Sequence, residues 1–212
     1  MEELSQKIIA YLASVLYKKI AKERLTQKDF EKKVEKIANY ISELIRQRIF
    51  YELIDKEPFV NILGQVISKS IETDIGEMDF QIKTEYYIET SEKDFFYNVN
   101  ILIEHKFGKT SKSVYQLFRD IIYECSNFYD DLILGISIHN GSILRLVFSA
   151  YKNRKGYVLS SHKIYRFPRF RDKNDFTVLL KREEILNLIE GFRKSNNKKA
   201  FAKKILFNYL LK

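Results

Sequence analysis

Two carboxylates and an ammonium group lie in a short, otherwise apolar stretch of the chain. Asp94 is followed ten residues later by Glu104, and Lys106 stands two residues after Glu104. Side chains alternate along a strand with a period of two, so Glu104 and Lys106 should share one face of a strand. Mg²⁺ prefers carboxylate oxygens, and a nearby lysine can orient a water molecule and stabilise charge on a phosphate. These residues therefore suit metal-assisted hydrolysis of a phosphate ester.

The partner of Glu104 depends on where the chain turns. Residues 98–100 read NVN, and Asn tolerates turn conformations, so a hairpin centred on Val99 would place Asp94 opposite Glu104. A second register stays open. If residues 79–89 and 95–107 form one long hairpin with its turn near Ser91, Asp79 lies opposite Glu104 instead. We prefer Asp94 because its register needs fewer strand residues.

The pattern D-x(10)-E-x-K on a hairpin resembles the PD-(D/E)xK nuclease superfamily, and residues 94–106 are especially similar to the core of its phage and archaeal junction-resolving members. Lys93 replaces the Pro that precedes the Asp in the family motif, and Asn stands in the turn where many members have Gly. The spacing of the family motif also favours Asp94 over Asp79. The whole chain is similar to nuclease-like proteins of Sulfolobus spindle-shaped viruses.

The resemblance implies an α/β fold with a restriction-endonuclease-like core, which is a mixed sheet flanked by helices in the order αβββαβ. It implies Asp94, Glu104 and Lys106 as catalytic residues and Mg²⁺ or Mn²⁺ as the cofactor. Asp94, Glu104 and the backbone carbonyl of His105 would be metal ligands. A glutamate on the first core helix often completes such a site. Glu57 is preferred over Glu72 for this role because the N-terminus of that helix should lie closer to the metal.

The expected elements fall into three parts. Residues 1–56 form an N-terminal helical hairpin, and its second helix starts at a capping box made by Thr26 and Asp29. Residues 57–150 form the nuclease-like core, and residues 151–212 form a basic C-terminal extension packed on it. The core begins with a third helix that has Pro58 in its first turn and an apolar face over residues 59–67. It continues with a strand over 79–89, the motif hairpin, a helix from about residue 111, and strands over 132–138 and 143–149.

The helix after the motif carries an apolar stripe that ends at Cys125, which we interpret as a buried structural residue. Gln116, Arg119 and Asp120 are expected to lie off that stripe. The resemblance makes Gln116 a candidate for a supporting position near the metal. A strand over 157–165 and helices over 183–192 and 200–211 are expected in the extension.

Charge is distributed unevenly. The whole chain has a net charge of +9, residues 51–100 are acidic, and residues 151–212 contain 17 basic and 5 acidic residues. A basic surface beside an acidic site favours DNA as the partner. The segment 162–173 interleaves arginines with aromatic residues, which can bind phosphates and stack on bases. The candidate DNA-binding residues are Lys109, Lys112, Lys163, Arg166, Arg169 and Arg171.

Composition limits the other functions. The 212 residues include no run of 18 apolar residues and no signal-peptide pattern. We therefore expect a soluble, cytoplasmic protein that does not bind a membrane. If the protein is viral, we expect it in the host cytoplasm. One Cys and three His make a structural zinc site implausible. The sequence also has no Gly-rich phosphate-binding loop, so we expect no nucleotide cofactor.

The sequence thus predicts a Mg²⁺-dependent deoxyribonuclease, with branched DNA in viral replication, repair or recombination as a candidate substrate. Junction-resolving relatives act as two-fold dimers, so we expect a homodimer. Two alternatives stay open: a DNA-binding protein that keeps the nuclease fold without turnover, and a protein-interaction subunit.

Overall fold

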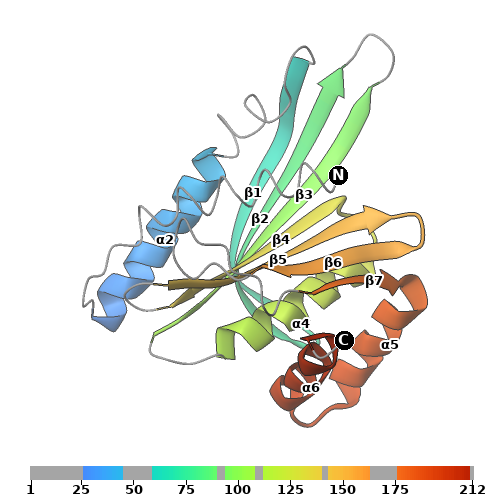
Figure 1. The fold of residues 1–212 in the computed structure, drawn as a ribbon. Helices are drawn as coiled ribbons and strands as arrows, with labels where there is room; N and C mark the ends of the chain where they lie inside the picture. Colours follow the sequence, from blue (N-terminus) through green and yellow to red (C-terminus); the bar gives the residue numbers. More distant parts are fainter. Residues whose placement is uncertain are drawn as a thin grey trace.

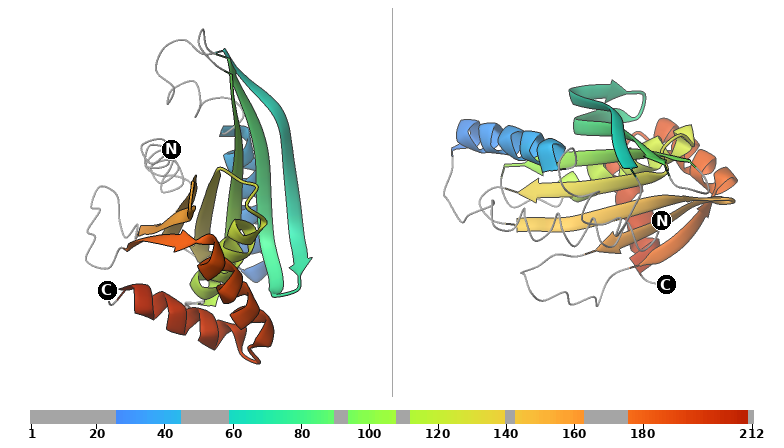
Figure 2. Two further views of the ribbon diagram at one scale, coloured as in Figure 1. Left: turned by 90° about the vertical axis from the view of Figure 1, so that its right-hand side faces the viewer. Right: turned by 90° about the horizontal axis from the view of Figure 1, so that it is seen from above.

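A seven-stranded mixed sheet forms the centre of the computed structural model, which describes residues 26–44, 59–89, 94–107, 112–139, 143–162 and 176–210. The strands lie in chain order from β1 to β7; β3 and β4 are parallel, and all other neighbours are antiparallel. Helix α2 covers one face of β1–β3, and α4, α5 and α6 lie on the other side (Figures 1 and 2). None of the helices in the described ranges is long and apolar enough to cross a membrane.

Helix α2 (Gln27–Leu44) starts where the sequence predicts. The Asp29 N–H donates to Thr26 Oγ1, and the Thr26 hydroxyl donates back to the Asp29 carboxylate at 2.6 Å. A cap of this kind satisfies an N–H group that has no partner inside the helix. The helix buries an apolar stripe against the sheet: Phe30, Val34, Ile37, Ala38 and Ile41. The predicted helix before it lies outside the described residues.

Strand β1 (Phe59–Thr73) replaces the third helix that the sequence predicts. The apolar residues at 59–67 have helical spacing, but they pair with β2 (Gly76–Glu89) in a long antiparallel ladder, with a bulge between Ile62 and Gly64. The ladder orders about thirty residues at once, and this tertiary pairing outweighs the local periodicity. Leu63 and Val66 are exposed on β1, so the helical stripe is not a core-facing one.

Strand β3 (Phe95–Lys106) runs straight through residues 98–100, where a turn is predicted. The two asparagines make contacts that fix an extended chain. The Asn98 N–H donates to Asp131 Oδ2, and the buried Asn100 amide donates to Glu124 and Asp130. The chain instead reverses between β2 and β3, which pair from Ile88↔Phe95 to Phe80↔Ile103. This is the long-hairpin register that the sequence left open as the alternative.

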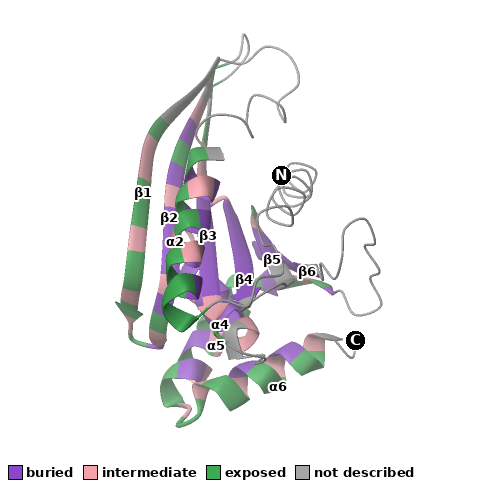
Figure 3. Ribbon diagram, turned by 90° about the vertical axis from the view of Figure 1, so that its left-hand side faces the viewer, coloured by how far each residue is buried: buried purple, intermediate pink, exposed green. Residues whose placement is uncertain are grey.

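Helix α4 (Lys112–Asn127) connects β3 to the parallel strand β4 (Leu132–His139), and it packs directly on the sheet at Gly135. A Cβ atom at Gly135 would lie 2.5 Å from Ile121 Cδ1 and 3.1 Å from Leu117 Cγ, so the absence of a side chain allows this close approach. Strand β4 is buried on both faces, as predicted (Figure 3). Cys125 is a buried free cysteine in the same core.

The C-terminal part extends the sheet and does not form a separate layer. Strand β5 (Ile143–Asn153) crosses the expected boundary at residue 150, and β6 (Gly156–His162) and β7 (Thr177–Lys181) continue the sheet. No element is predicted from the sequence at the position of β7. Helices α5 (Arg182–Lys194) and α6 (Lys198–Leu210) match the predicted helices within a few residues and pack against α4. Residues 151–162 and 176–210 therefore share one core with the preceding strands.

Candidate functional site

Three acidic residues from three elements lie close together at the end of β3. Glu104 lies on β3 and Asp120 on α4, and each is 1% exposed. Glu104 in its protonated form donates a hydrogen bond to Asp120. Asp79 on β2 joins them, because its backbone N–H donates to Glu104 Oε1 at 3.1 Å. We call Asp79, Glu104 and Asp120 the carboxyl cluster.

Burial controls the protonation of the carboxyl cluster. It raises the pKa of Glu104 to about 10, and the nearby Asp120 and Asp79 carboxylates add to that shift. It also raises the pKa of Asp120 to about 7, although the Arg119 guanidinium opposes this rise. Glu104 therefore holds its proton at neutral pH and shares it with Asp120. Strong shifts of this type gather at functional sites, although buried structural networks also produce them.

Arg119 secures Asp120 on α4. Its Nε donates to Asp120 Oδ1 at 2.7 Å, and its Nη2 donates to the Glu77 backbone carbonyl at 2.7 Å. The guanidinium lies against Gly76, where φ is +140° and a Cβ atom would come within 2.1 Å of Arg119 Nη1. Glycine at the start of β2 thus leaves room for the arginine that neutralises Asp120.

His105 lies on the opposite face of β3 from Glu104, beneath α2. Its ring is 5.8 Å from the rings of Phe30 and Phe80, measured between centroids. The His105 N–H donates to Asp79 Oδ2 at 2.8 Å, and His105 Nδ1 lies 2.7 Å from the same oxygen. Asp79 therefore contacts both sides of β3: its backbone meets Glu104 and its carboxylate meets His105.

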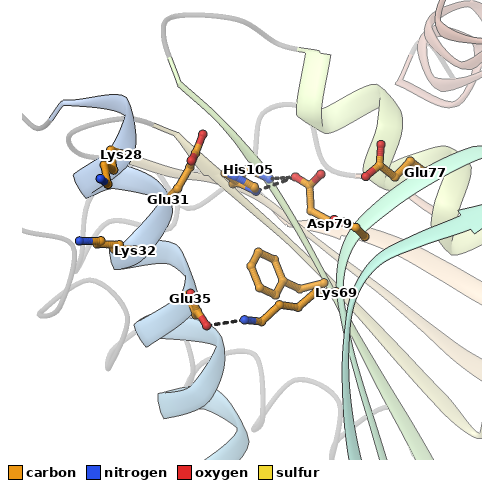
Figure 4. Close-up of a pocket in the computed structure, with 10 residues that line it drawn as sticks. Lys28, Glu31, Lys32, Glu35, Lys69, Glu77, Asp79 and His105 are labelled. Atoms are coloured by element: carbon orange, nitrogen blue, oxygen red, sulfur yellow. Dashed lines mark hydrogen bonds and ion pairs between the residues drawn. The ribbon is translucent and has the colours of Figure 1, made fainter.

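A pocket of about 450 Å³ opens between α2 and the β1–β2 ladder, with Asp79 and His105 among its lining residues (Figure 4). Charged side chains of both signs surround it. Lys69 forms an ion pair with Glu35. Lys28 and Lys32, one turn apart on α2, are exposed along its α2 side. Glu31 and Glu77 complete the acidic part of the lining. Solvent can therefore reach the Asp79 carboxylate, which is 18% exposed, from this side.

The predicted pairing of Asp94 with Glu104 is wrong. Asp94 stands just before the first residue of β3, and Glu104 is near its last, so about 33 Å of extended strand separates them. Asp94 lies at the far end of the β2–β3 hairpin, where its carboxylate accepts a hydrogen bond from Tyr87. The register places Asp79 next to Glu104, because Phe80 pairs with Ile103.

Other predicted site residues fall in three groups. Lys106 is the last residue of β3, half-buried, and strand alternation puts it on the face of Glu104. Gln116 is half-buried on α4, one turn before Asp120. Glu72, the less favoured acid, is exposed on β1. The third group lies outside the described residues or has no described side chain: Glu57, Lys109, Lys112, Lys163, Arg166, Arg169 and Arg171.

Asp120 and Arg119 are not among the predicted site residues, because helical spacing was expected to put them off the buried face of α4. Both are buried, at 1% and 8% exposure. A signal was present: Asp120 and the buried Glu124 are four residues apart and flank Ile121, so they belong to the stripe that faces the sheet. Carboxylates inside an apolar stripe need partners, and Glu104 and Asn100 on β3 supply them.

The donor atoms of Glu104 and Asp120 are of the type that a hard cation takes, whereas the Asp79 carboxylate faces His105 on the other side of β3. Glu104 Oε2 and Asp120 Oδ2 are buried and accept no hydrogen bond from an N–H group of the described residues, and oxygen ligands are those that Mg²⁺ and Mn²⁺ take. In the described part of the chain, no three His, Cys, Asp or Glu side chains are already arranged around a single point. A cation would therefore have to displace the shared proton of Glu104 and Asp120.

No family model, no curated protein and no solved structure matches this chain.

Proposed function

We propose that the protein is a metal-dependent endonuclease that hydrolyses DNA phosphodiesters, with its site at the carboxyl cluster. The observation that carries the proposal is the placement of Asp79 on β2 beside Glu104 on β3, with Lys106 two residues further on the face of Glu104. The order α2–β1–β2–β3–α4–β4 around these residues supports it, because it is the order that the resemblance implies.

Each residue has a distinct role in the proposal. Asp79 and Glu104 would hold Mg²⁺ or Mn²⁺ with the His105 carbonyl, and the metal would supply Lewis-acid activation of the phosphate. Asp120 orients Glu104 through their hydrogen bond, and Arg119 keeps Asp120 in place. Lys106 orients the attacking water and stabilises charge on the phosphate. Gln116 supports the site from the preceding turn of α4.

The pocket beneath α2 gives the substrate a place next to Asp79. Lys28 and Lys32 line it and are exposed, and they make no hydrogen bond or ion pair in the described part of the chain. Their ammonium groups are free to bind phosphates of a DNA strand that passes Asp79. On branched DNA, a homodimer would present two such sites to two strands.

A second function has its own support. Metal ligands must be deprotonated, and the pKa of about 10 for Glu104 opposes this at neutral pH. A DNA-binding protein that keeps this arrangement without turnover would also have a protonated Glu104. The two functions differ in whether DNA is cut when Mg²⁺ or Mn²⁺ is present.

Replacing Lys106 with Ala should abolish cleavage of plasmid and four-way DNA in Mg²⁺ while leaving DNA affinity within about threefold, because one lysine contributes one phosphate contact at most. The assay measures cleavage and binding for the wild type and for Lys106→Ala. Lys152→Ala, an exposed lysine on β5, is the matched control. Cutting by the Lys106→Ala protein at the wild-type rate would remove Lys106 from the site. Binding without cutting by the wild type would favour the second function.

Replacing Lys28 and Lys32 together with Ala should lower the log–log salt slope of DNA binding by about 1.8, because each phosphate that is no longer neutralised lowers the slope by about 0.9. Lys203→Ala with Lys204→Ala removes the same charge from α6, away from the pocket, and should change the slope less. Fluorescence anisotropy at several salt concentrations measures both slopes. Equal slopes for the two double variants would mean that the DNA does not pass the pocket.

A further inference from the structure

Ser70 has an unusual backbone conformation in the middle of strand β1. Its φ is 48°, and within the described ranges Phe128 is the only other non-glycine residue with a positive φ. Residues other than Gly, Asn and Asp rarely adopt this left-handed conformation, and strands do not require it. Ser70 also lines the pocket beside Asp79.

Strand β1 changes face at Ser70. Before this residue, Gln65 donates to Ser42 and Lys69 pairs with Glu35, so both side chains point towards α2. Strand alternation would place Ile71 on the same side as Lys69. Ile71 instead packs against the core cluster that contains α4, on the opposite face of the sheet.

Strand β2 changes face at the position opposite Ser70. Phe80 contacts the ring of His105 on the α2 side. Met78, two residues earlier, is buried in the cluster on the α4 side. The ladder pairs Lys69 with Phe80 and Ile71 with Met78, so the break in both strands falls at the facing residues Ser70 and Asp79.

This shared inversion determines where the Asp79 carboxylate points. Gln81 lies opposite Leu102, on the α4 side, and regular alternation would send Asp79 the same way. The inversion turns the Asp79 carboxylate towards His105 on the α2 side, while its backbone N–H still reaches Glu104. A single left-handed residue acts like a bulge, which re-aims the side chains of a strand pair.

We propose that Ser70 is a positioning residue, and that its left-handed backbone turns the β1–β2 ladder so that Asp79 links His105 to Glu104. The link to catalysis rests on the proposed nuclease function, but the geometry does not. The backbone of Ser70 provides this effect, and its hydroxyl is dispensable. Residues that accept a positive φ should therefore substitute for serine, whatever the size or polarity of their side chains.

The test is a series at position 70 in metal-free protein without DNA, so a failure of the nuclease proposal would not affect it. Gly and Asn accept a positive φ, Ala removes only the hydroxyl of Ser70, and the β-branched Val strongly resists a positive φ. Ser68→Val, on the same strand two residues earlier, is the matched control. The readout is the ¹H–¹⁵N signal of the His105 amide and its hydrogen exchange. The Asp79→Ala variant gives the reference values of the signal position and of the exchange rate for a His105 amide that has no carboxylate acceptor.

Ser70→Gly, Ser70→Asn, Ser70→Ala and Ser68→Val should keep the wild-type His105 amide signal. Ser70→Val should shift it towards the Asp79→Ala position and speed exchange by about tenfold or more, as expected for losing a hydrogen bond to a charged group. If Ser70→Val does not fold, Ser70→Thr, which is β-branched and keeps the hydroxyl, decides. A wild-type His105 signal in the β-branched variant would overturn the proposal. So would loss of the signal in Ser70→Ala, which would assign the effect to the serine hydroxyl.

Discussion

Replacing Glu104 with Gln should remove most of the loss of stability that the wild-type chain shows as pH rises from about 5 to about 9. Glu104 has an ordinary pKa of 4.5 and a pKa of about 10 in the folded protein. Between these values the folded chain binds a proton that the unfolded chain has released. Folding is therefore favoured at low pH, and the free energy of unfolding falls with pH by up to about 1.4 kcal/mol per unit.

The Gln variant has no such proton to lose. A neutral amide can donate to Asp120 as the protonated Glu104 does, so the packing should survive. Asp120, whose pKa is raised to about 7, adds a smaller loss in the same direction at lower pH. Urea unfolding at a series of pH values measures the effect. Asp94→Asn, an exposed carboxylate, is the control and should follow the wild type. Parallel curves for Glu104→Gln and wild type would show that Glu104 is ionised in the folded protein.

Elements with one dominant pattern could be predicted from the sequence. The alternation over 79–89, the apolar run of β4 and the stripe of α4 each lead to the observed element. The E-x-K part of the candidate site was also placed on its strand end by alternation alone. Local pattern was enough here because burial on one or both faces follows directly from residue type.

The errors came from residues whose partners are far away in the sequence. Asn98 and Asn100 are turn formers by local preference, but Asp131, Glu124 and Asp130 bind them in an extended strand. Interpreting the two asparagines as turn residues moved the turn and selected Asp94 in place of Asp79. The apolar residues of β1 fit a helix by spacing, and only their ladder with β2 makes them a strand. Long-range pairing of this kind leaves no local signal.

Asp120 shows a different limit. A charged residue within an apolar helical stripe can be a solvated neighbour or a buried partner, and spacing alone does not separate them. The buried interpretation needs Glu104 to face it from β3. Once the long hairpin and the parallel β3–β4 pair are in place, the two carboxyl groups can only meet between the sheet and α4.

Asp79→Asn should lower metal-dependent DNA cleavage by about a hundredfold or more, because a metal ligand contributes several kcal/mol to the transition state. Asn keeps the size of Asp79 and its backbone N–H, which donates to Glu104, so the fold should be unchanged. The comparison is Asp94→Asn, which makes the same chemical change at the other end of the β2–β3 hairpin. This variant should cut DNA at the wild-type rate.

Calorimetric titration of Mn²⁺ into the wild type, Asp79→Asn and Asp94→Asn tests most directly whether Asp79 and Glu104 form the metal site. Asp79→Asn should bind Mn²⁺ about tenfold or more weakly. Replacing even a residue that only hydrogen-bonds to a metal ligand lowers metal affinity by about tenfold or more. Asp94→Asn should bind as the wild type does. Equal affinity of the wild type and Asp79→Asn, or a loss confined to Asp94→Asn, would contradict a metal site built on the carboxyl cluster.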